Sequence, residues 1–179
     1  MNPLRFYRLN PLLDDDTIMV DIASHEDYFF TAGCRFEEPV PEPVEFAVDE
    51  GLGGTRWPTL LLPQPVFRAD FVAELRRLGV ANIDDYAARV VRASTAEVRL
   101  DYRAVNIVGA IACADLERST FDRMDTLYQF ERLVIDPGRT GGADFFRLAE
   151  DPEIIVVAAS VAERIDRTAF PDLLLELLE

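Results

Sequence analysis

The residues best suited to chemistry follow an apolar run that ends at Ala114. Asp115, Glu117 and Arg118 place two carboxylates and a guanidinium close together in the chain. Such a group could exchange protons with a substrate or hold a small charged ligand. Carboxylate pairs are common, however, and an apolar strand that leaves the core also needs polar side chains to satisfy its freed backbone donors. The sequence favours backbone capping, with a catalytic or ligand-binding pocket at residues 115–118 as the alternative.

A second group of carboxylates lies in the stretch FEEPVPEPVEFAVDE, residues 36–50. Its alternating prolines fix φ and remove backbone donors, which favours extended chain over helix or central strand. GLGG at 51–54 then predicts a flexible turn. We therefore predict an exposed acidic Pro/Gly-rich loop over residues 37–56. The loop is either a solvated linker or a surface that faces a partner, and its candidate binding residues are Glu37, Glu38, Glu42, Glu45, Asp49 and Glu50.

The other reactive residues form no catalytic or metal-binding set. His25 is the sole histidine, which excludes the usual zinc sets and leaves only half of a dyad. Asp14–Asp16 lacks the spaced ligands of a Ca²⁺ loop and predicts a solvated turn. Cys34 and Cys113 form no CxxC pair, so each is predicted to be a small buried hydrophobe. All 18 basic residues are arginine, which excludes lysine chemistry. We expect no metal, no cofactor and no enzymatic activity.

The chain of 179 residues carries a net charge of −15. That charge argues against nucleic acid or an anionic membrane surface as a partner. It favours a basic protein partner, or it serves solubility alone. No apolar run approaches the ~20 residues of a membrane span, and the first residues lack a signal-peptide pattern. We therefore expect a cytoplasmic protein with one domain over residues 1–179.

The elements that would position these residues are short. Apolar residues recur at helical spacing over 71–78, between Asp70 as a candidate N-cap and Gly79 as a stop, and they predict a helix there. Alternation of apolar and polar residues over 98–104 predicts a strand with one buried face. Further β-like runs lie at 106–114, 127–136, 144–151 and 153–159.

Two more helices are predicted towards the end of the chain. Ser160 and Glu163 have the spacing of a capping box, which indicates a helix that begins at Ser160. Pro171 interrupts the chain, and DLLLELLE at 172–179 predicts a short apolar helix. The mixed order of elements predicts an α+β fold: a mainly antiparallel sheet, a few short helices and the acidic loop.

Several short motifs follow one another along nearly the whole chain. They are YRL at 7–9, WP at 57–58, LPQPVFR at 62–68, LGVANI at 78–83, YRAVNIVG at 102–109, CADLERS at 113–119, and FRLAED followed by EIIVV at 146–157. This ordered set resembles a family of bacterial immunity proteins, long known as a domain of unknown function in myxobacteria and other proteobacteria. That family is associated with polymorphic toxins and type VI secretion effectors. The acidic segment, residues 37–50, does not match the family pattern.

The resemblance implies a cytoplasmic, non-enzymatic protein that binds and neutralises a cognate toxin encoded by an adjacent gene. It implies neither catalytic residues nor a cofactor. Many such toxins are basic nucleases, and an acidic inhibitor can occupy a basic active site, where charge complementarity raises the association rate. The acidic segment is then the candidate toxin-facing element.

Overall fold

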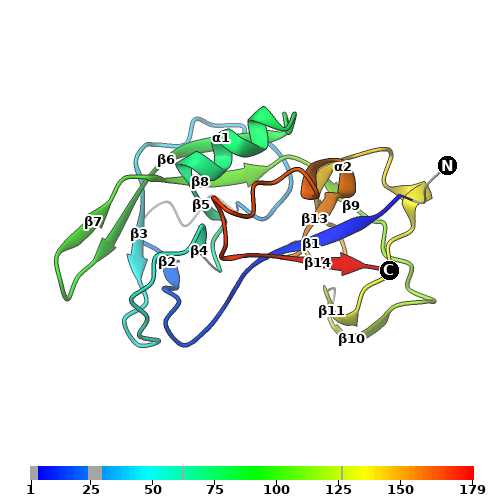
Figure 1. The fold of residues 1–179 in the computed structure, drawn as a ribbon, viewed down its shortest axis with the longest axis horizontal. Helices are drawn as coiled ribbons and strands as arrows, with labels where there is room; N and C mark the ends of the chain where they lie inside the picture. Colours follow the sequence, from blue (N-terminus) through cyan, green and yellow to red (C-terminus); the bar gives the residue numbers. More distant parts are fainter. Residues whose placement is uncertain (1–3, 24–29, 62, 126) are drawn as a thin grey trace.

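The fold is mainly β. The computed structural model describes residues 4–23, 30–61, 63–125 and 127–179. Strands make up 41% of the described structure and helices 10%, and Figure 1 shows two groups of strands side by side. The predicted α+β class is therefore wrong. The physical reason is that the segments predicted to be helical after Ser160 form only one short helix and a strand.

A seven-stranded sheet occupies the left part of Figure 1. Its strand order is β2-β3-β6-β8-β5-β4, and β7 pairs with the C-terminal end of β6. The pairing of β3 with β6 is parallel and the other pairings are antiparallel. The strands are β2 (Val20–Ile22), β3 (Val44–Val48), β4 (Leu60–Leu61), β5 (Val66–Arg68), β6 (Ile83–Arg92), β7 (Glu97–Arg99) and β8 (Tyr102–Ile107).

A five-stranded sheet with the order β14-β1-β13-β12-β9 occupies the right part of Figure 1. β1 lies between β13 and β14 and is antiparallel to both, whereas β12 and β9 are parallel. β10 and β11 form a separate hairpin. The strands are β1 (Phe6–Pro11), β9 (Ala110–Ile111), β10 (Thr120–Met124), β11 (Leu127–Arg132), β12 (Phe145–Leu148), β13 (Ile155–Ala158) and β14 (Leu173–Leu178), and a 3-10 turn, η1 (Pro137–Arg139), follows β11.

One hydrophobic core joins the two sheets. Leu9 and Ile155 of the five-stranded sheet belong to the same buried cluster as Phe67 and Ile107 of the seven-stranded sheet. α1 (Ala69–Arg77) adds its apolar face to this cluster. Burial of apolar surface between the sheets is the main stabilising contribution. The sheets therefore form a single unit, and a cavity described below lies between them.

The predicted helix after Asp70 is confirmed as α1. Gly79 follows it with a φ of 97°, in the left-handed region that glycine adopts at helix ends. Asp70 is not the N-cap, however, because it lies inside the first turn. Its carboxylate forms an ion pair with Arg68 at 2.6 Å, and this interaction lowers the pKa of Asp70.

Of the last two predicted helices, the one at Ser160 is confirmed as α2 (Ala159–Ala162), but without its capping box, and the one at 172–179 is wrong. α2 is a single turn in which the Ser160 hydroxyl donates to Asp144 at 2.5 Å instead of capping the backbone. DLLLELLE forms β14, because it pairs along its length with β1 and buries Leu173 and Leu178. A nearly uninterrupted run of leucines carries no clear period, so strand pairing decides its conformation.

The strand predicted over 98–104 is divided between β7 and β8. Tyr102 and Ala104 are fully buried as expected, whereas Val98 and Leu100 are exposed. β7 lies at the far left of Figure 1, at the tip of a long hairpin with β6. The strands predicted at 127–136, 144–151 and 153–159 are confirmed, in shorter form, by β11, β12 and β13.

Candidate functional site

The acidic segment is not a continuous exposed loop. Its second half forms β3, which lies between β2 and β6 and buries Val44, Phe46 and Val48. The prediction of an exposed loop over 37–56 is therefore wrong for this strand. Apolar residues alternate there between carboxylates, and they face the core. In the first half, every residue of 37–43 other than Val40 is exposed and lies outside any strand.

Strand β3 separates the predicted binding residues into two groups. Glu37, Glu38 and Glu42 precede the strand and are exposed, whereas Asp49 and Glu50 follow it. Five strand residues extend a chain by about 17 Å. The two groups therefore lie at opposite ends of β3 and do not form one surface.

The group before β3 carries the least compensated charge. Glu37 and Glu38 make no hydrogen bond or ion pair with the described residues. Glu42 accepts a hydrogen bond from the backbone N–H of Ala87, which fixes the end of the exposed stretch to β6. Glu45, inside β3, forms an ion pair with an arginine of β6 at 2.8 Å. Glu45 is thus part of the sheet, and the other three carboxylates face solvent.

The group after β3 is held by backbone donors. The Asp49 carboxylate accepts from the N–H of Gly51 at 2.9 Å. Glu50 accepts from the N–H of Ser94, in the β6–β7 turn, at 2.7 Å, and this hydrogen bond lowers the pKa of Glu50. These two carboxylates therefore stabilise turns in the fold.

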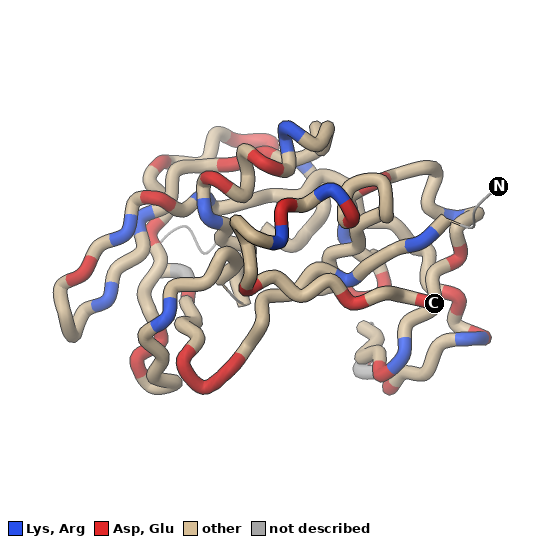
Figure 2. The backbone as a smooth tube through the Cα atoms, in the orientation of Figure 1, with Lys and Arg blue, Asp and Glu red and all other residues tan. Residues whose placement is uncertain are grey.

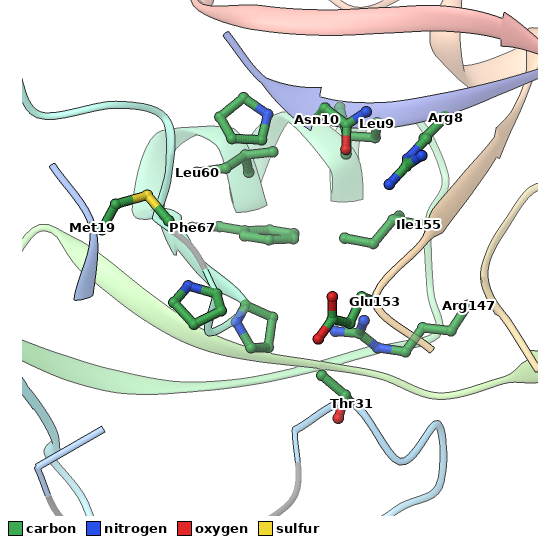
Figure 3. Close-up of a pocket in the computed structure, with 13 residues that line it drawn as sticks. Arg8, Leu9, Asn10, Met19, Thr31, Leu60, Phe67, Arg147, Glu153 and Ile155 are labelled. Carbon is green, nitrogen blue, oxygen red and sulfur yellow. The ribbon is translucent and has the colours of Figure 1, made fainter. Parts of the chain in front are cut away.

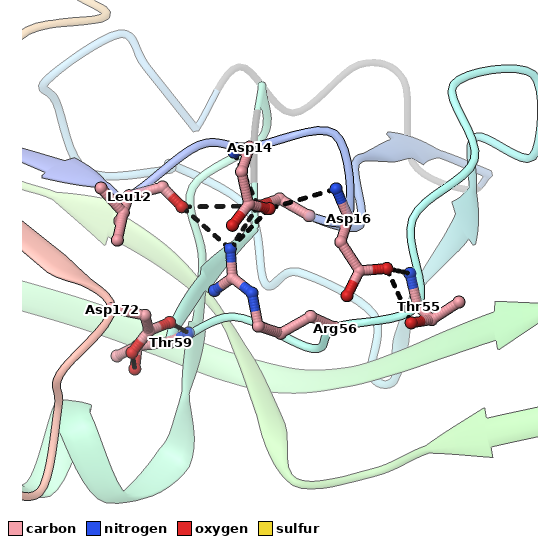
Figure 4. A network of polar contacts seen from close by, with 8 residues as sticks. Leu12, Asp14, Asp16, Thr55, Arg56, Thr59 and Asp172 are labelled. Atoms are coloured by element: carbon pink, nitrogen blue, oxygen red, sulfur yellow. Dashed lines mark hydrogen bonds and ion pairs between the residues drawn. The ribbon is translucent and has the colours of Figure 1, made fainter.

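The turn after β3 contacts a second acidic turn, residues 14–16. Asp16 accepts from the backbone N–H and the hydroxyl of Thr55, at 2.9 and 2.7 Å. Asp14 forms an ion pair with Arg56 at 2.9 Å (Figure 4), and this contact lowers the pKa of Asp14. Figure 2 shows the two acidic turns next to each other at the lower left of the view. The predicted solvated turn is therefore exposed but fixed by its neighbours.

Gly54 lies where these two turns meet. A Cβ at this position would lie 2.6 Å from the Thr17 carbonyl oxygen, and the φ of Gly54 is 82°. The GLGG segment therefore forms a turn and also packs closely against the backbone of Thr17. Across the described ranges, no three His, Cys, Asp or Glu side chains are grouped so that they could hold a metal ion.

The polar cluster after β9 is a turn that hydrogen-bonds to itself. Asp115 Oδ1 accepts from the backbone N–H groups of Glu117 and Arg118, both at 3.2 Å. Ser119 Oγ accepts from the N–H of Val134 at 3.0 Å. The Glu117 and Arg118 side chains are exposed. This geometry assigns the Asp115 carboxylate to backbone capping and gives no support to a catalytic pocket.

The two cysteines differ in exposure. Cys113 is fully buried as predicted, but Cys34 is exposed, so the prediction is wrong for that thiol. Burial raises the pKa of Cys113 to about 12, and the charges of Glu150 and Asp136 contribute in the same direction. His25, which could supply the base of a catalytic dyad, lies outside the described residues.

We expect the native protein to react with iodoacetamide at a single thiol, Cys34, at about pH 8, because only an accessible thiolate is alkylated quickly. Intact-mass spectrometry measures the number of added groups. A Cys34→Ala variant should stay unlabelled when native, and denaturant should expose Cys113 to the reagent. Rapid double labelling of the native wild type would contradict the assigned burial.

A cavity of about 170 Å³ lies between the two sheets. Its walls include Leu9 and Ile155 from the five-stranded sheet and Leu60 and Phe67 from the seven-stranded sheet (Figure 3). Arg147 of β12 lines the same cavity and is only 1% exposed. A buried guanidinium in mainly apolar surroundings is costly unless an acceptor compensates its charge.

Arg147 belongs to none of the candidate sites recognised in the sequence. The available signal is the alternation within FFRL: Phe145 and Arg147 point to the same face of β12, and Phe145 is buried. A charged residue at a core-facing position of a short apolar strand therefore marks this site. The burial of Arg147 depends on the second sheet, which covers that face of β12. The local sequence pattern does not reveal that sheet.

No helix in the described part of the chain is long and apolar enough to cross a membrane. Comparison with protein-family models finds no matching family, and comparison with curated proteins finds no match. The resemblance to bacterial immunity proteins therefore rests on the motifs quoted above.

Proposed function

We propose that this chain is a cytoplasmic immunity protein that binds and neutralises a basic protein toxin, as the family that it resembles implies. The observation that carries the proposal is the acidic surface before β3. The chain has a net charge of −15, and Glu37, Glu38 and Glu42 are exposed and form no ion pair with the described residues. Uncompensated carboxylates attract a basic partner and raise its association rate.

The neighbouring side chains extend this acidic surface onto β6. Tyr86 of β6 is half-buried, and its pKa is raised first by burial and then by the Asp84 and Glu42 carboxylates. Both carboxylates therefore act on the same phenol, which indicates that negative charge accumulates there. Asp84 is in part balanced by Arg35, at 3.5 Å.

Aromatic packing holds the acidic surface in place. The Phe36 ring, directly before Glu37, lies 5.3 Å from the Phe30 ring and 6.1 Å from the Tyr86 ring, measured between centroids. A binding surface that is ordered before the partner arrives loses less conformational entropy on association. The proposed action is occlusion: the acidic surface covers a basic site on the toxin and excludes its substrate.

The direct test is to produce the protein encoded by the adjacent gene in a heterologous host, with and without this chain. We expect growth to be restored by this chain and the two proteins to elute together in size-exclusion chromatography. Absence of both rescue and complex would rule the proposal out.

Neutralising the group before β3 should slow association with that toxin. We expect the E37Q/E38Q/E42Q variant to associate about 10-fold more slowly at low salt, with a weaker dependence on salt concentration. Stopped-flow or surface-plasmon kinetics over a salt series measures both quantities. Glutamine keeps the acceptor that Ala87 uses, so the fold should be preserved.

A matched control removes the same charge at the other end of β3. The D15N/D49N/E50Q variant also loses three carboxylates, and its amides retain the acceptors that hold the turns. We expect its association rate to stay within about twofold of the wild type, apart from a general effect of net charge. Equal slowing by the two variants would show that the surface before β3 has no special role.

A further inference from the structure

Arg147 has hydrogen-bonding capacity that the fold leaves unused. Its Nη1 donates to the Pro152 carbonyl oxygen at 2.5 Å. Its Nε and Nη2 are buried and have no hydrogen-bond partner among the described residues. Buried polar groups are nearly always paired, because an unpaired one has lost its water and gained nothing in return. Two buried nitrogens with three unpaired N–H groups on one guanidinium therefore point to an acceptor from outside the described residues.

The guanidinium also lacks a close counter-charge. Burial lowers the pKa of Arg147 to about 10, which still leaves it protonated at neutral pH. Glu153 is the acidic residue whose charge acts on it. The Glu153 carboxylate lines the same cavity (Figure 3), but it makes no hydrogen bond with Nε or Nη2. A fixed positive charge thus borders a mainly apolar cavity.

Elsewhere in this chain, the same two nitrogens of arginine bind carboxylates. Nε and Nη2 of Arg68 donate to the two oxygens of Asp70 at 2.7 and 2.6 Å. Those of Arg99 donate to the two oxygens of Asp101 at 2.8 and 2.5 Å. This side-on fork matches the spacing of carboxylate oxygens. The unused pair on Arg147 is the same fork.

We propose that the cavity binds a small organic acid, with its carboxylate on Nε and Nη2 of Arg147 and a compact apolar group against Leu9, Leu60, Phe67 and Ile155. Mainly apolar walls with a small number of placed polar groups are the usual composition of a small-molecule site. Here Arg147 is the buried polar group, and Arg8, Asn10, Thr31 and Glu153 also line the cavity. The walls select for a branched or aromatic group, and the fork selects for a carboxylate. This site is separate from the acidic surface before β3, and it does not depend on toxin binding.

Wild-type protein and two pairs of probes test the ligand class. Phenylacetate and 3-methylbutanoate carry both features, whereas phenylacetamide lacks the charge and acetate lacks the apolar group. We expect the first two to raise the melting temperature of the full chain in a concentration-dependent way and to give a binding isotherm by calorimetry. Phenylacetamide and acetate should give neither. Equal shifts from phenylacetate and phenylacetamide would overturn the proposal.

Variants at the anchor test its assignment. Arg147→Met replaces the guanidinium with an apolar side chain of similar length and should weaken phenylacetate binding about 10–100-fold. Arg147→Lys keeps the charge without the fork and should give an intermediate loss. Glu153→Gln removes the competing carboxylate and should bind at least as tightly as the wild type. Wild-type affinity in Arg147→Met, or lost binding in Glu153→Gln, would show that Arg147 is not the anchor. The probe pairs decide the question if Arg147→Met does not fold.

Discussion

The Phe71→Ala variant is expected to lose about 3–5 kcal/mol of its free energy of unfolding. Phe71 is fully buried in α1, and its ring centroid lies 5.0 Å from that of Phe170 and 5.9 Å from that of Phe67. Phe170 precedes β14 of the five-stranded sheet, whereas Phe67 belongs to β5 of the seven-stranded sheet. Truncation therefore opens a hole at the junction of the two sheets, where the chain cannot collapse without moving one sheet against the other.

Equilibrium unfolding in urea, followed by circular dichroism, measures this loss. Phe121→Ala is the matched control, because Phe121 is half-buried and packs against Tyr128 and Phe130 within the β10–β11 hairpin. We expect the control to lose about 1–2 kcal/mol. Equal losses in the two variants would contradict the view that the sheet junction dominates stability.

The Asp172→Ala variant is expected to lose about 2–4 kcal/mol. Asp172 lies just before β14, and its two carboxylate oxygens accept from the hydroxyl and the backbone N–H of Thr59, at 2.6 and 2.5 Å (Figure 4). Thr59 is fully buried. Removing the carboxylate therefore leaves two buried donors of Thr59 without their acceptors.

Two further variants separate this hydrogen-bonding effect from a change in shape. Asp172→Asn keeps one acceptor oxygen and should lose about half as much as Asp172→Ala. In a Thr59→Val background one of the two donors is already absent, so Asp172→Ala should cost less than it does in the wild type. Urea unfolding of the wild type, Asp172→Ala, Thr59→Val and the double variant gives the coupling energy. If the losses of unfolding free energy in the two single variants simply add in the double variant, the Asp172–Thr59 interaction makes no contribution of its own.

Local patterns predicted some elements and not others, for physical reasons. α1 was predictable because residues 71–78 repeat at helical spacing and Gly79 ends the helix. β14 was not, because its leucine run fits either period. The deciding interaction is its pairing with β1, at the other end of the chain, and no local signal reports a pairing so distant.

The candidate sites divide in the same way. Capping by Asp115 followed from its residue type and its place after a strand, and the structure confirms it. β3 was hidden, because prolines and carboxylates around Val44 and Phe46 resemble a solvated segment. The role of Arg147 could not be predicted from the sequence of β12, because its burial depends on the second sheet and on the cavity between the two sheets.

The position of β1 in the five-stranded sheet sets the timing of folding during synthesis. Both neighbours of β1 come from residues 155–178, at the far end of the chain. At roughly 5–20 residues per second, a ribosome adds β13 and β14 about 8–30 s after β1. The seven-stranded sheet, by contrast, uses residues 20–107 and can assemble earlier. A chain that lacks β14 would leave one edge of β1 unpaired, and such an open edge can pair with strands of other chains.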